Sequence, residues 1–286
     1  MGTIENIEEV LPEGPLIGVL LLYPGGPRTY GEIEEFADVN GLESSSDALS
    51  ELTVKYQLTG GPSTAHDTAW LQKVSLQREL DVKSKGTFKV FLACLNWHPF
   101  IGEAVEEMVG LGVSRIIVAP LGSVLEEPDE PGWTHSIQEA IDAAGTTCEV
   151  TALGAWAQTD EFLEVVADRL RQMASGTESK VFFTSPHPGP RSRGSLERLQ
   201  AAAGEIARRS GIDDWDVAWE PGLVGSSGRS LLERLKEHKG QQRVIVVPIG
   251  STGDSLSTLF GIDVECADWM QGQNMQMIRM ESLNHD

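Results

Sequence analysis

Short hydrophobic runs alternate with amphipathic stretches along most of the chain, beginning at residue 16. A run such as LIGVLLL at 16–22 offers no polar position at which one face could meet water. Uninterrupted runs of this kind are typical of parallel strands that are covered on both faces. The runs that predict strands are 16–22, 89–94, 115–119, 149–153, 180–184, 215–220 and 243–249.

Between these runs, apolar residues recur every three or four positions, the spacing that places them on one face of an α-helix. The clearest case is 160–174, where the apolar face is formed by Phe162, Val165, Val166, Leu170 and Met173. The predicted helices are 99–111, 134–144, 160–174, 195–210 and 230–238, with a further helical segment beginning at 256–260.

Strands that alternate with helices of this length indicate right-handed βαβ units and parallel sheets. The alternation starts again after about residue 150, which predicts an α/β fold with two Rossmann-like lobes. We expect an acidic N-terminal segment at 1–15, a first lobe at 16–150 and a second lobe at 151–286. Ligands of such folds bind beyond the carboxyl ends of the strands. The loops expected to line a cleft between the lobes are 23–28, 94–99, 120–135, 184–193 and 250–258.

Composition narrows the class of partner. The formal net charge of −21 argues against binding to nucleic acid or to anionic lipid, since both need clustered Lys and Arg. The cysteines, Cys94, Cys148 and Cys266, are dispersed, which argues against a disulfide framework or a zinc knuckle and favours a reducing cytoplasm. The N-terminal region lacks the basic start of a signal peptide, and no apolar run approaches the roughly 20 residues of a membrane helix. We expect a soluble, cytoplasmic monomer.

Two of the loops can be tested against known chemistry. The loop at 23–28 contains neither a Walker A pattern nor G-x-G-x-x-G, and Pro24 and Pro27 remove backbone donors, so no nucleotide is expected. The stretch 250–255 lacks the G-x-S-x-G nucleophile elbow. A turn is the better interpretation there, with Thr252 or Asp254 capping the helix that follows.

Among the histidines, His187 is the best candidate for chemistry. It follows a predicted strand directly, within SPHPGPR, so flanking prolines present it rigidly at the strand's carboxyl end. An imidazole in that place could bind a borderline metal or take a proton near neutral pH. For His98, which precedes Pro99, a structural role and a functional one stay equally open.

Several fragments, in order along the chain, resemble the ferrochelatase family. They are GVLLLYPGGP at 18–27, YQLTGGPS at 56–63, HPFIGEAVEEM at 98–108, SPHPGP at 185–190, VVPIGSTGDSLSTLFGID at 246–263 and ESLN at 281–284. The resemblance covers residues 16 to 284 and implies a chelatase fold. It also implies insertion of a divalent metal, Fe²⁺ first and Zn²⁺ second, into a tetrapyrrole, in heme-type biosynthesis.

The resemblance also assigns site residues. The family's metal- and proton-handling His carries over to His187. Its opposing Glu falls on Ser257, which cannot accept a proton as a carboxylate does. Asp254 is retained and is expected to act with these two. The residues expected to line the ligand pocket are Tyr23, Pro24, Asn96, Trp97, His98, Ser123, Ser185 and Ser255.

Other departures from the family lie at 95–97 and 119–123, where the usual pocket residues are replaced. Three functions therefore stay open: a tetrapyrrole chelatase, an enzyme that reuses the cleft for a different ligand or metal complex, and a protein that binds a porphyrin or metal without turnover. No iron–sulfur cluster is expected, because the family's C-terminal cysteines are absent from this sequence.

Overall fold

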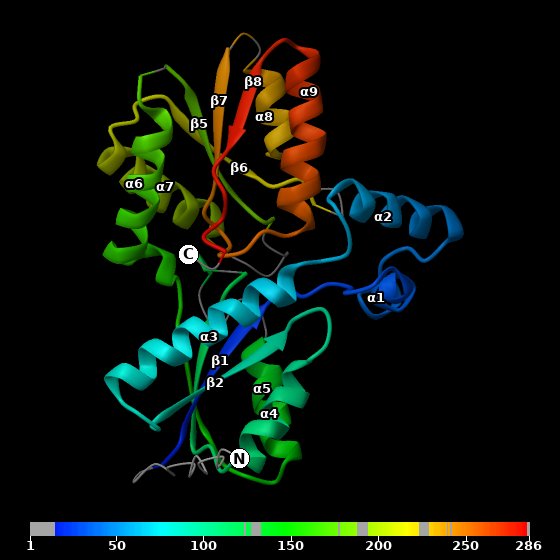
Figure 1. The fold of residues 1–286 in the computed structure, drawn as a ribbon, viewed down its shortest axis with the longest axis vertical. Coiled ribbons are helices and arrows are strands. Elements are labelled where there is room, and N and C mark those ends of the chain that lie inside the picture. The colour runs from blue at the N-terminus through cyan, green and yellow to red at the C-terminus, as the bar shows by residue number, and fades with distance from the viewer. Residues whose placement is uncertain are drawn as a thin grey trace, which may run out of the picture.

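The computed structural model describes residues 15–122, 124–126, 133–176, 178–187, 194–222, 229–238, 240 and 242–284. Within these residues the chain forms two four-stranded sheets, one in each lobe, with helices on both faces of each sheet. Figure 1 shows the lobes one above the other, the first below and the second above. The predicted α/β fold is confirmed.

The first sheet has the order β2-β1-β3-β4 and is parallel throughout. Alternate residues of the central strand point to opposite faces, so Leu20 and Leu22 pack against α4 and α5, whereas Val19 and Leu21 lie in the cluster that includes α3. The elements are β1 (Ile17–Tyr23), β2 (Phe88–Cys94), β3 (Arg115–Pro120), β4 (Glu149–Ala152), α3 (Ala65–Lys83), α4 (Ile101–Gly110) and α5 (Trp133–Ala143).

The second sheet repeats this order as β6-β5-β7-β8. One face packs against α6 and α7, and the other against α8, η3 and α9. The elements are β5 (Lys180–Ser185), β6 (Trp215–Trp219), β7 (Arg243–Pro248), β8 (Gln276–Arg279), α6 (Asp160–Ala174), α7 (Ser195–Ser210), α8 (Leu231–Glu237), the π-helix η3 (Ser257–Cys266) and α9 (Ala267–Gly272).

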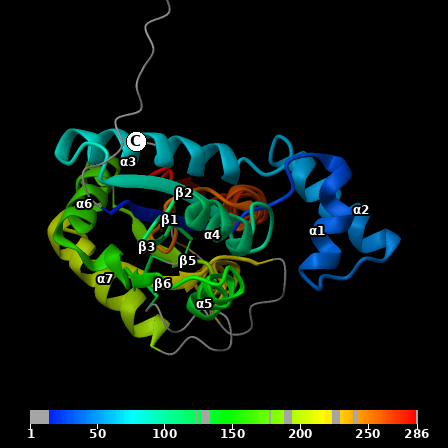
Figure 2. The same ribbon diagram turned by 90° about the horizontal axis from the view of Figure 1, so that it is seen from below.

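Each predicted strand is present, although the structure adds elements that the pattern does not predict. These are the edge strand β8 and the helices α1 (Ile33–Val39), α2 (Ser46–Leu58) and α3. Figure 2 shows α1 and α2 at one side of the molecule, where α2 contacts η3 of the second lobe. Helix α6 has the predicted bounds, but Val165 is exposed, so the expectation that it belongs to the buried face is wrong. Leu163 and Ala167, two positions before and after it, are buried instead.

Among the described residues, no helix is both long enough and apolar enough to cross a bilayer.

Candidate functional site

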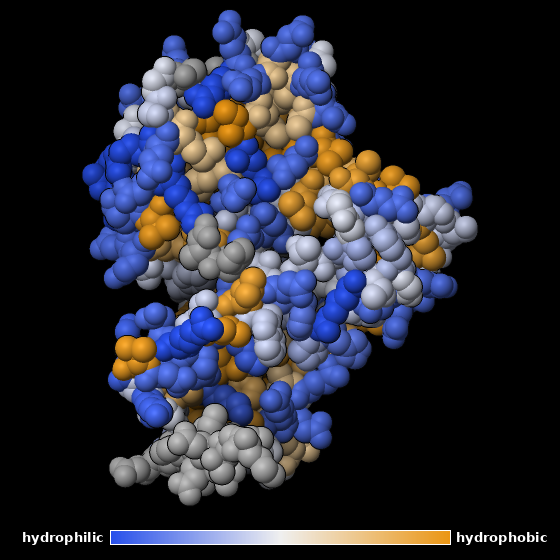
Figure 3. Space-filling model, in the orientation of Figure 1, coloured by the Kyte–Doolittle hydropathy of each residue, from blue (hydrophilic) through white to orange (hydrophobic). Residues whose placement is uncertain are grey.

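The carboxyl ends of the two sheets meet at the junction between the lobes. The loop after β3 is hydrogen-bonded to the loop after β7: Val124 N donates to Gly250 O at 3.3 Å, and Thr252 N donates to Leu121 O at 2.8 Å. Gln72 of α3 adds a side-chain bond from its Nε2 to Thr252 Oγ1 at 3.2 Å. Figure 3 shows the outline of the molecule indented between the lobes. The loop 251–257 therefore belongs to the place where parallel α/β folds bind ligands.

Three pockets surround this loop. The first, which we call the junction pocket, contains about 310 Å³ of empty space, part of it open to solvent, and lies between the end of β1, helix α3 and residues 251–255. The second, the glycine-loop pocket, contains about 360 Å³, also partly open to solvent, and lies between residues 59–64 and 254–256. The third, the α2–η3 pocket, measures about 570 Å³, part of it open to solvent, and is lined by Ser257. Ser255 lines the first two pockets, so one short loop borders all three.

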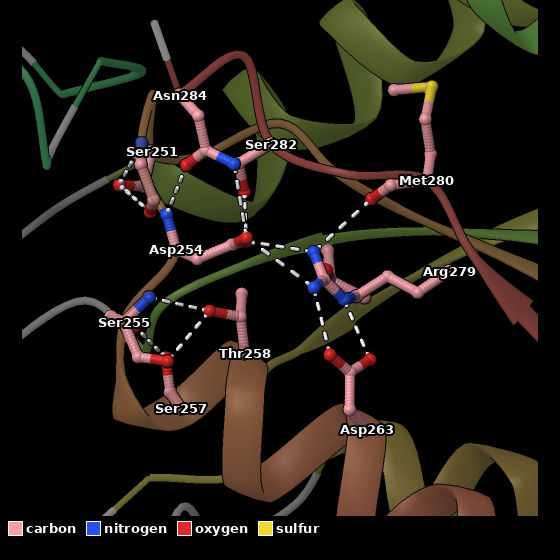
Figure 4. Close-up of polar contacts among 12 residues, drawn as sticks. Ser251, Asp254, Ser255, Ser257, Thr258, Asp263, Arg279, Met280, Ser282 and Asn284 are labelled. Carbon is pink, nitrogen blue, oxygen red and sulfur yellow. Dashed lines mark hydrogen bonds and ion pairs between the residues drawn. The ribbon is translucent and has the colours of Figure 1, made fainter. Parts of the chain in front are cut away.

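Asp254, expected to be catalytic, is the centre of a polar network. Its Oδ1 accepts from Arg279 Nη1 and from Ser282 Oγ, each at 2.8 Å, and its Oδ2 accepts from Asn284 Nδ2 at 3.2 Å. Arg279 is also paired with Asp263 of η3. Figure 4 shows these side chains converging from the loop, from η3 and from the segment after β8. The carboxylate thus anchors the ESLN segment, and its catalytic role stays a prediction.

The start of the helix after this loop differs from the expectation. Ser255 N donates to Thr258 Oγ1 at 2.6 Å, and Thr258 Oγ1 donates to Ser255 O at 2.8 Å, so these two residues close the first turn. The prediction that Thr252 or Asp254 caps it is wrong, because their side chains are bonded to α3, to Leu121 and to the C-terminal segment. η3 is a π-helix, a form that often occurs at functional sites.

The residue that sequence reasoning missed is Glu220. It follows the last residue of β6, its backbone N donates to Ser185 O at 2.8 Å, and it is 1% exposed. Ser257 Oγ donates to Glu220 Oε2 at 2.6 Å, and Thr184 Oγ1 donates to Oε1 at 3.5 Å. Burial raises the pKa of Glu220 to about 7, against the hydrogen bond from Ser257 and the charge of Arg279, which lower it. The site therefore holds a carboxylate beside Ser257 after all.

The sequence signal for Glu220 was available in principle. An acidic residue that ends a buried apolar strand in a parallel sheet lies at the ligand-binding edge. The predicted strand 215–220 contained it as a terminal residue, without assigning it a role. Because β6 neighbours β5, the register Ser185–Trp219 places Glu220 beside the strand end that carries His187.

His187 is exposed, two residues beyond the end of β5. Its ring lies 5.8 Å, centroid to centroid, from the ring of Trp219, in an edge-on arrangement. Ser185 is buried beneath Gly250, where a Cβ would come within 1.9 Å of Ser185 Oγ and 2.7 Å of its Cα. The glycine therefore allows the ends of β5 and β7 to approach, and Ser185 contributes packing at the base of the site. The rest of the loop, 188–193, lies outside the described residues.

The end of β1 supplies a second set of polar groups. Tyr23 is buried, and its hydroxyl is 2.7 Å from Nδ1 of His66. Arg28 Nη2 lies 3.0 Å from the same nitrogen, and because a guanidinium can only donate, Nδ1 is an acceptor. Burial and the charge of Arg28 lower the pKa of His66. Tyr23 and Pro24 line the junction pocket, which places both predicted residues at the site.

The segment at 96–98 lies beside the β1 loop. Asn96 N donates to Pro24 O at 3.0 Å. Trp97 is buried, and its Nε1 donates to Glu32 Oε2 at 3.1 Å. The same carboxylate oxygen accepts from Arg28 N, so the indole helps to hold the loop after β1. His98 is exposed and pairs with Glu103 at 3.0 Å. Direct contact of Asn96, Trp97 and His98 with a ligand stays a prediction.

Two predicted features stand apart from this geometry. Ser123, expected in the pocket, lies outside the described residues. Within the described part of the chain, no three His, Cys, Asp or Glu side chains come together in a way that could hold a metal ion. The assignment of His187 as a metal ligand therefore stays a prediction.

The arrangement of two parallel sheets facing one junction defines a class of fold that solved chelatases share. The sirohydrochlorin chelatase SirB from Bacillus subtilis subspecies spizizenii, solved with cobalt, superposes with a TM-score of 0.55 over 92% of this chain and 87% of that one, at 13% identity. A multi-domain protein from Deinococcus radiodurans, described as structurally similar to chelatases, gives 0.52 over 95% of this chain and 52% of its own. At such low identity the likeness concerns the fold alone.

Sequence comparison identifies the family. The family model described as Ferrochelatase matches residues 43–286, so the chain belongs to the ferrochelatase family. Relatives include a ferrochelatase of Herpetosiphon aurantiacus, 24% identical over 94% of this chain and 93% of its own length. A coproporphyrin III ferrochelatase of Halalkalibacterium halodurans is 28% identical over 87% of this chain and 86% of its own. The resemblance noted in the sequence motifs is thereby confirmed.

Proposed function

We propose that the protein is a metal chelatase that inserts a divalent cation, Fe²⁺ in the first place, into a tetrapyrrole of heme-type biosynthesis. The observation that carries the proposal is the juxtaposition, at the lobe junction of a ferrochelatase-family fold, of His187 and the buried carboxylate of Glu220 at the ends of neighbouring strands. Removing two pyrrole protons while a metal enters requires groups that bind a cation and groups that take protons. The relatives' names, which include coproporphyrin III ferrochelatases, support a porphyrin as substrate.

In this proposal His187 faces the entering metal, because its exposed imidazole is a suitable ligand for a borderline cation. The junction pocket, bordered by Tyr23 and Ser255, receives one edge of the macrocycle. The cation is a substrate that leaves in the product. We further propose that the protein works as a cytoplasmic monomer.

The test is anaerobic mixing with coproporphyrin III or protoporphyrin and either Fe²⁺ or Zn²⁺, followed by the Soret band. Turnover should shift the band progressively, beyond one equivalent of protein. A single shift in proportion to protein would instead identify a porphyrin-binding protein, and no shift with either porphyrin would overturn the proposal in favour of a different ligand.

The variant His187→Ala should lower the metallation rate by about 10-fold to 10²-fold, the loss that substitutions around a metal site typically cause. A matched control is His135→Ala, since His135 is an exposed histidine on α5 that pairs only with its helical neighbour Glu139 in the described contacts. Equal rates for the two variants would show that His187 takes no part.

A further inference from the structure

Glu220 is the least accessible carboxylate bordering the site, and the residues around it form a continuous set of hydroxyl contacts. Ser257 Oγ donates to Glu220 Oε2 at 2.6 Å, and Ser255 Oγ lies 2.8 Å from Ser257 Oγ. On the far side, Thr184 Oγ1 donates to Oε1 at 3.5 Å. Glu220 is buried and cannot be solvated by water. Its carboxyl group therefore depends on these hydrogen bonds for stabilisation.

These contacts connect the buried carboxylate with the pockets. Ser257 lines the α2–η3 pocket, and Ser255 lines both the junction pocket and the glycine-loop pocket. Hydroxyl groups both donate and accept, so each can receive a proton on one side while it releases its own on the other. A molecule in the junction pocket would thus touch one end of a relay whose other end is Glu220.

We propose that Glu220 is the proton acceptor of this site, reached through the hydroxyls of Ser257 and Ser255, and that it takes the place of the carboxylate that the chain lacks at position 257. This inference rests on the proposed function and names the group that receives the pyrrole protons.

As a metal–nitrogen bond forms, a pyrrole N–H bond breaks and its proton passes to Ser255 Oγ. Ser255 passes its own hydroxyl proton to Ser257 Oγ, and Ser257 passes its proton to Glu220 Oε2, which becomes a neutral carboxylic acid. The proton returns by the same route to water before the second N–H is lost. No electron is transferred, and the sum is a divalent cation exchanged for two protons.

The pKa and the hydrogen-bond partners of Glu220 both favour it over Asp254 as the proton acceptor. The raised pKa of Glu220, about 7, lets the group gain and lose a proton under neutral conditions. Asp254 is a poorer candidate on geometric grounds, because both of its oxygens already accept from Arg279, Ser282 or Asn284. Protonating Asp254 would weaken the bonds that hold the C-terminal segment, whereas among the described residues the side chain of Glu220 accepts from two hydroxyl groups.

The experiment compares wild-type protein with Glu220→Gln, Glu220→Asp and Ser257→Ala in porphyrin metallation from pH 5.5 to 8.5 (a range of about one and a half units on either side of the expected pKa). Glu220→Gln should lower the rate by about 10²-fold and abolish the inflection near neutral pH. Ser257→Ala leaves the carboxylate and interrupts the relay, so the rate should fall in the same direction. Glu220→Asp should recover part of the rate and the inflection. The control is Glu197→Gln, an exposed carboxylate on α7.

A second readout does not depend on turnover. Infrared difference spectra of the wild-type protein should contain a protonated-carboxyl C=O band that titrates near pH 7 and is missing from Glu220→Gln. If that variant does not fold, the same band and the rate of Ser257→Ala decide the question.

The two failures are distinguishable. A wild-type protein that metallates no tetrapyrrole overturns the proposed function and this inference with it. A wild-type protein that does metallate, with a pH profile unchanged in Glu220→Gln and Ser257→Ala or with no titrating carboxyl band, overturns this inference alone.

Discussion

Arg279 of β8 lies against Asp254 across the loop that leads into the π-helix, with Nη1 2.8 Å from Oδ1. The two side chains are only 9% and 14% exposed, and Arg279 also bonds to Asp263 of η3. One guanidinium therefore fixes the site loop and the π-helix to the last strand of the sheet. Breaking a buried pair on one side leaves an unpaired charge, which costs more than the pair itself contributes.

We expect Arg279→Ala to lower the free energy of unfolding by about 3 kcal/mol, the range found when one partner of a buried ion pair is removed. Urea denaturation followed by circular dichroism measures it. The matched control is Arg171→Ala, because Arg171 pairs with Glu164 and Asp168 on the exposed side of α6 and should cost at most about 1 kcal/mol. Equal losses for the two variants would contradict the anchoring role of Arg279.

The protonation of Glu220 should be visible in stability. Its folded-state pKa, about 7, exceeds the ordinary value of 4.5, so the folded state binds the proton more tightly than the unfolded state does. That stabilisation is complete below pH of about 4.5 and is lost as the pH rises through about 7. Relative to wild type, Glu220→Gln should therefore gain up to about 3 kcal/mol between pH 4 and pH 8.

Denaturant titrations at both pH values give this difference, and Glu197→Gln should lack it. A Glu220→Gln variant whose stability follows wild type at both pH values would mean that folding does not raise the pKa of Glu220.

A carboxylate returned to position 257 would face Glu220. Because Ser257 Oγ is 2.6 Å from Glu220 Oε2, Ser257→Glu alone puts two carboxylates in one place, and one of them should become much harder to ionise. The cleaner variant combines Ser257→Glu with Glu220→Gln. We expect the double variant to metallate porphyrin faster than Glu220→Gln alone, as measured from initial Soret shifts. Without such rescue, position 257 no longer serves the macrocycle.

A substitution at Gly250 tests whether the close approach of β5 and β7 requires glycine. A Cβ at this position would meet Ser185 Oγ at 1.9 Å and Ser185 Cα at 2.7 Å, so the backbone itself must move. Gly250→Ala should cost about 1–3 kcal/mol, as overpacking in a rigid core does. By contrast, Gly102→Ala in α4 meets nothing within 4 Å and should be neutral or stabilising. Thermal unfolding of both variants measures the contrast.

The sequence predicts the strands well because both faces of each sheet are covered. Strands such as β7, buried at every position after Arg243, leave an unbroken apolar run of a length that is typical of strands. The edge strand β8, with the sequence QMIR, carries no such run and was not predicted. The pattern does not predict helices α2 and α3 either. Apolar residues such as Val54, Trp70 and Val82 are exposed on them, so the apolar positions do not define a single face.

The candidate site was predicted in part. The resemblance to family motifs predicts His187 as a site residue and Ser257 in the place of a carboxylate, because both predictions follow from matching the sequence to a motif. The role of Glu220 could not be read that way, because it depends on which strand lies beside β5 and on a contact between residues 37 positions apart. Likewise, nothing in the local pattern of 250–255 indicates that Asp254 bonds to Arg279.

The bonds at the lobe junction also bear on how the chain assembles. Within each lobe, a sheet with the same strand order forms from pairings inside one half of the chain. Gln72, in contrast, reaches partners 180 and 212 positions away, at Thr252 and Asn284. Closing such long loops is slow, because it restricts the chain before it gains contacts. We therefore expect each lobe to collapse on its own before the hydrogen bonds of Gln72 join the two halves of the chain.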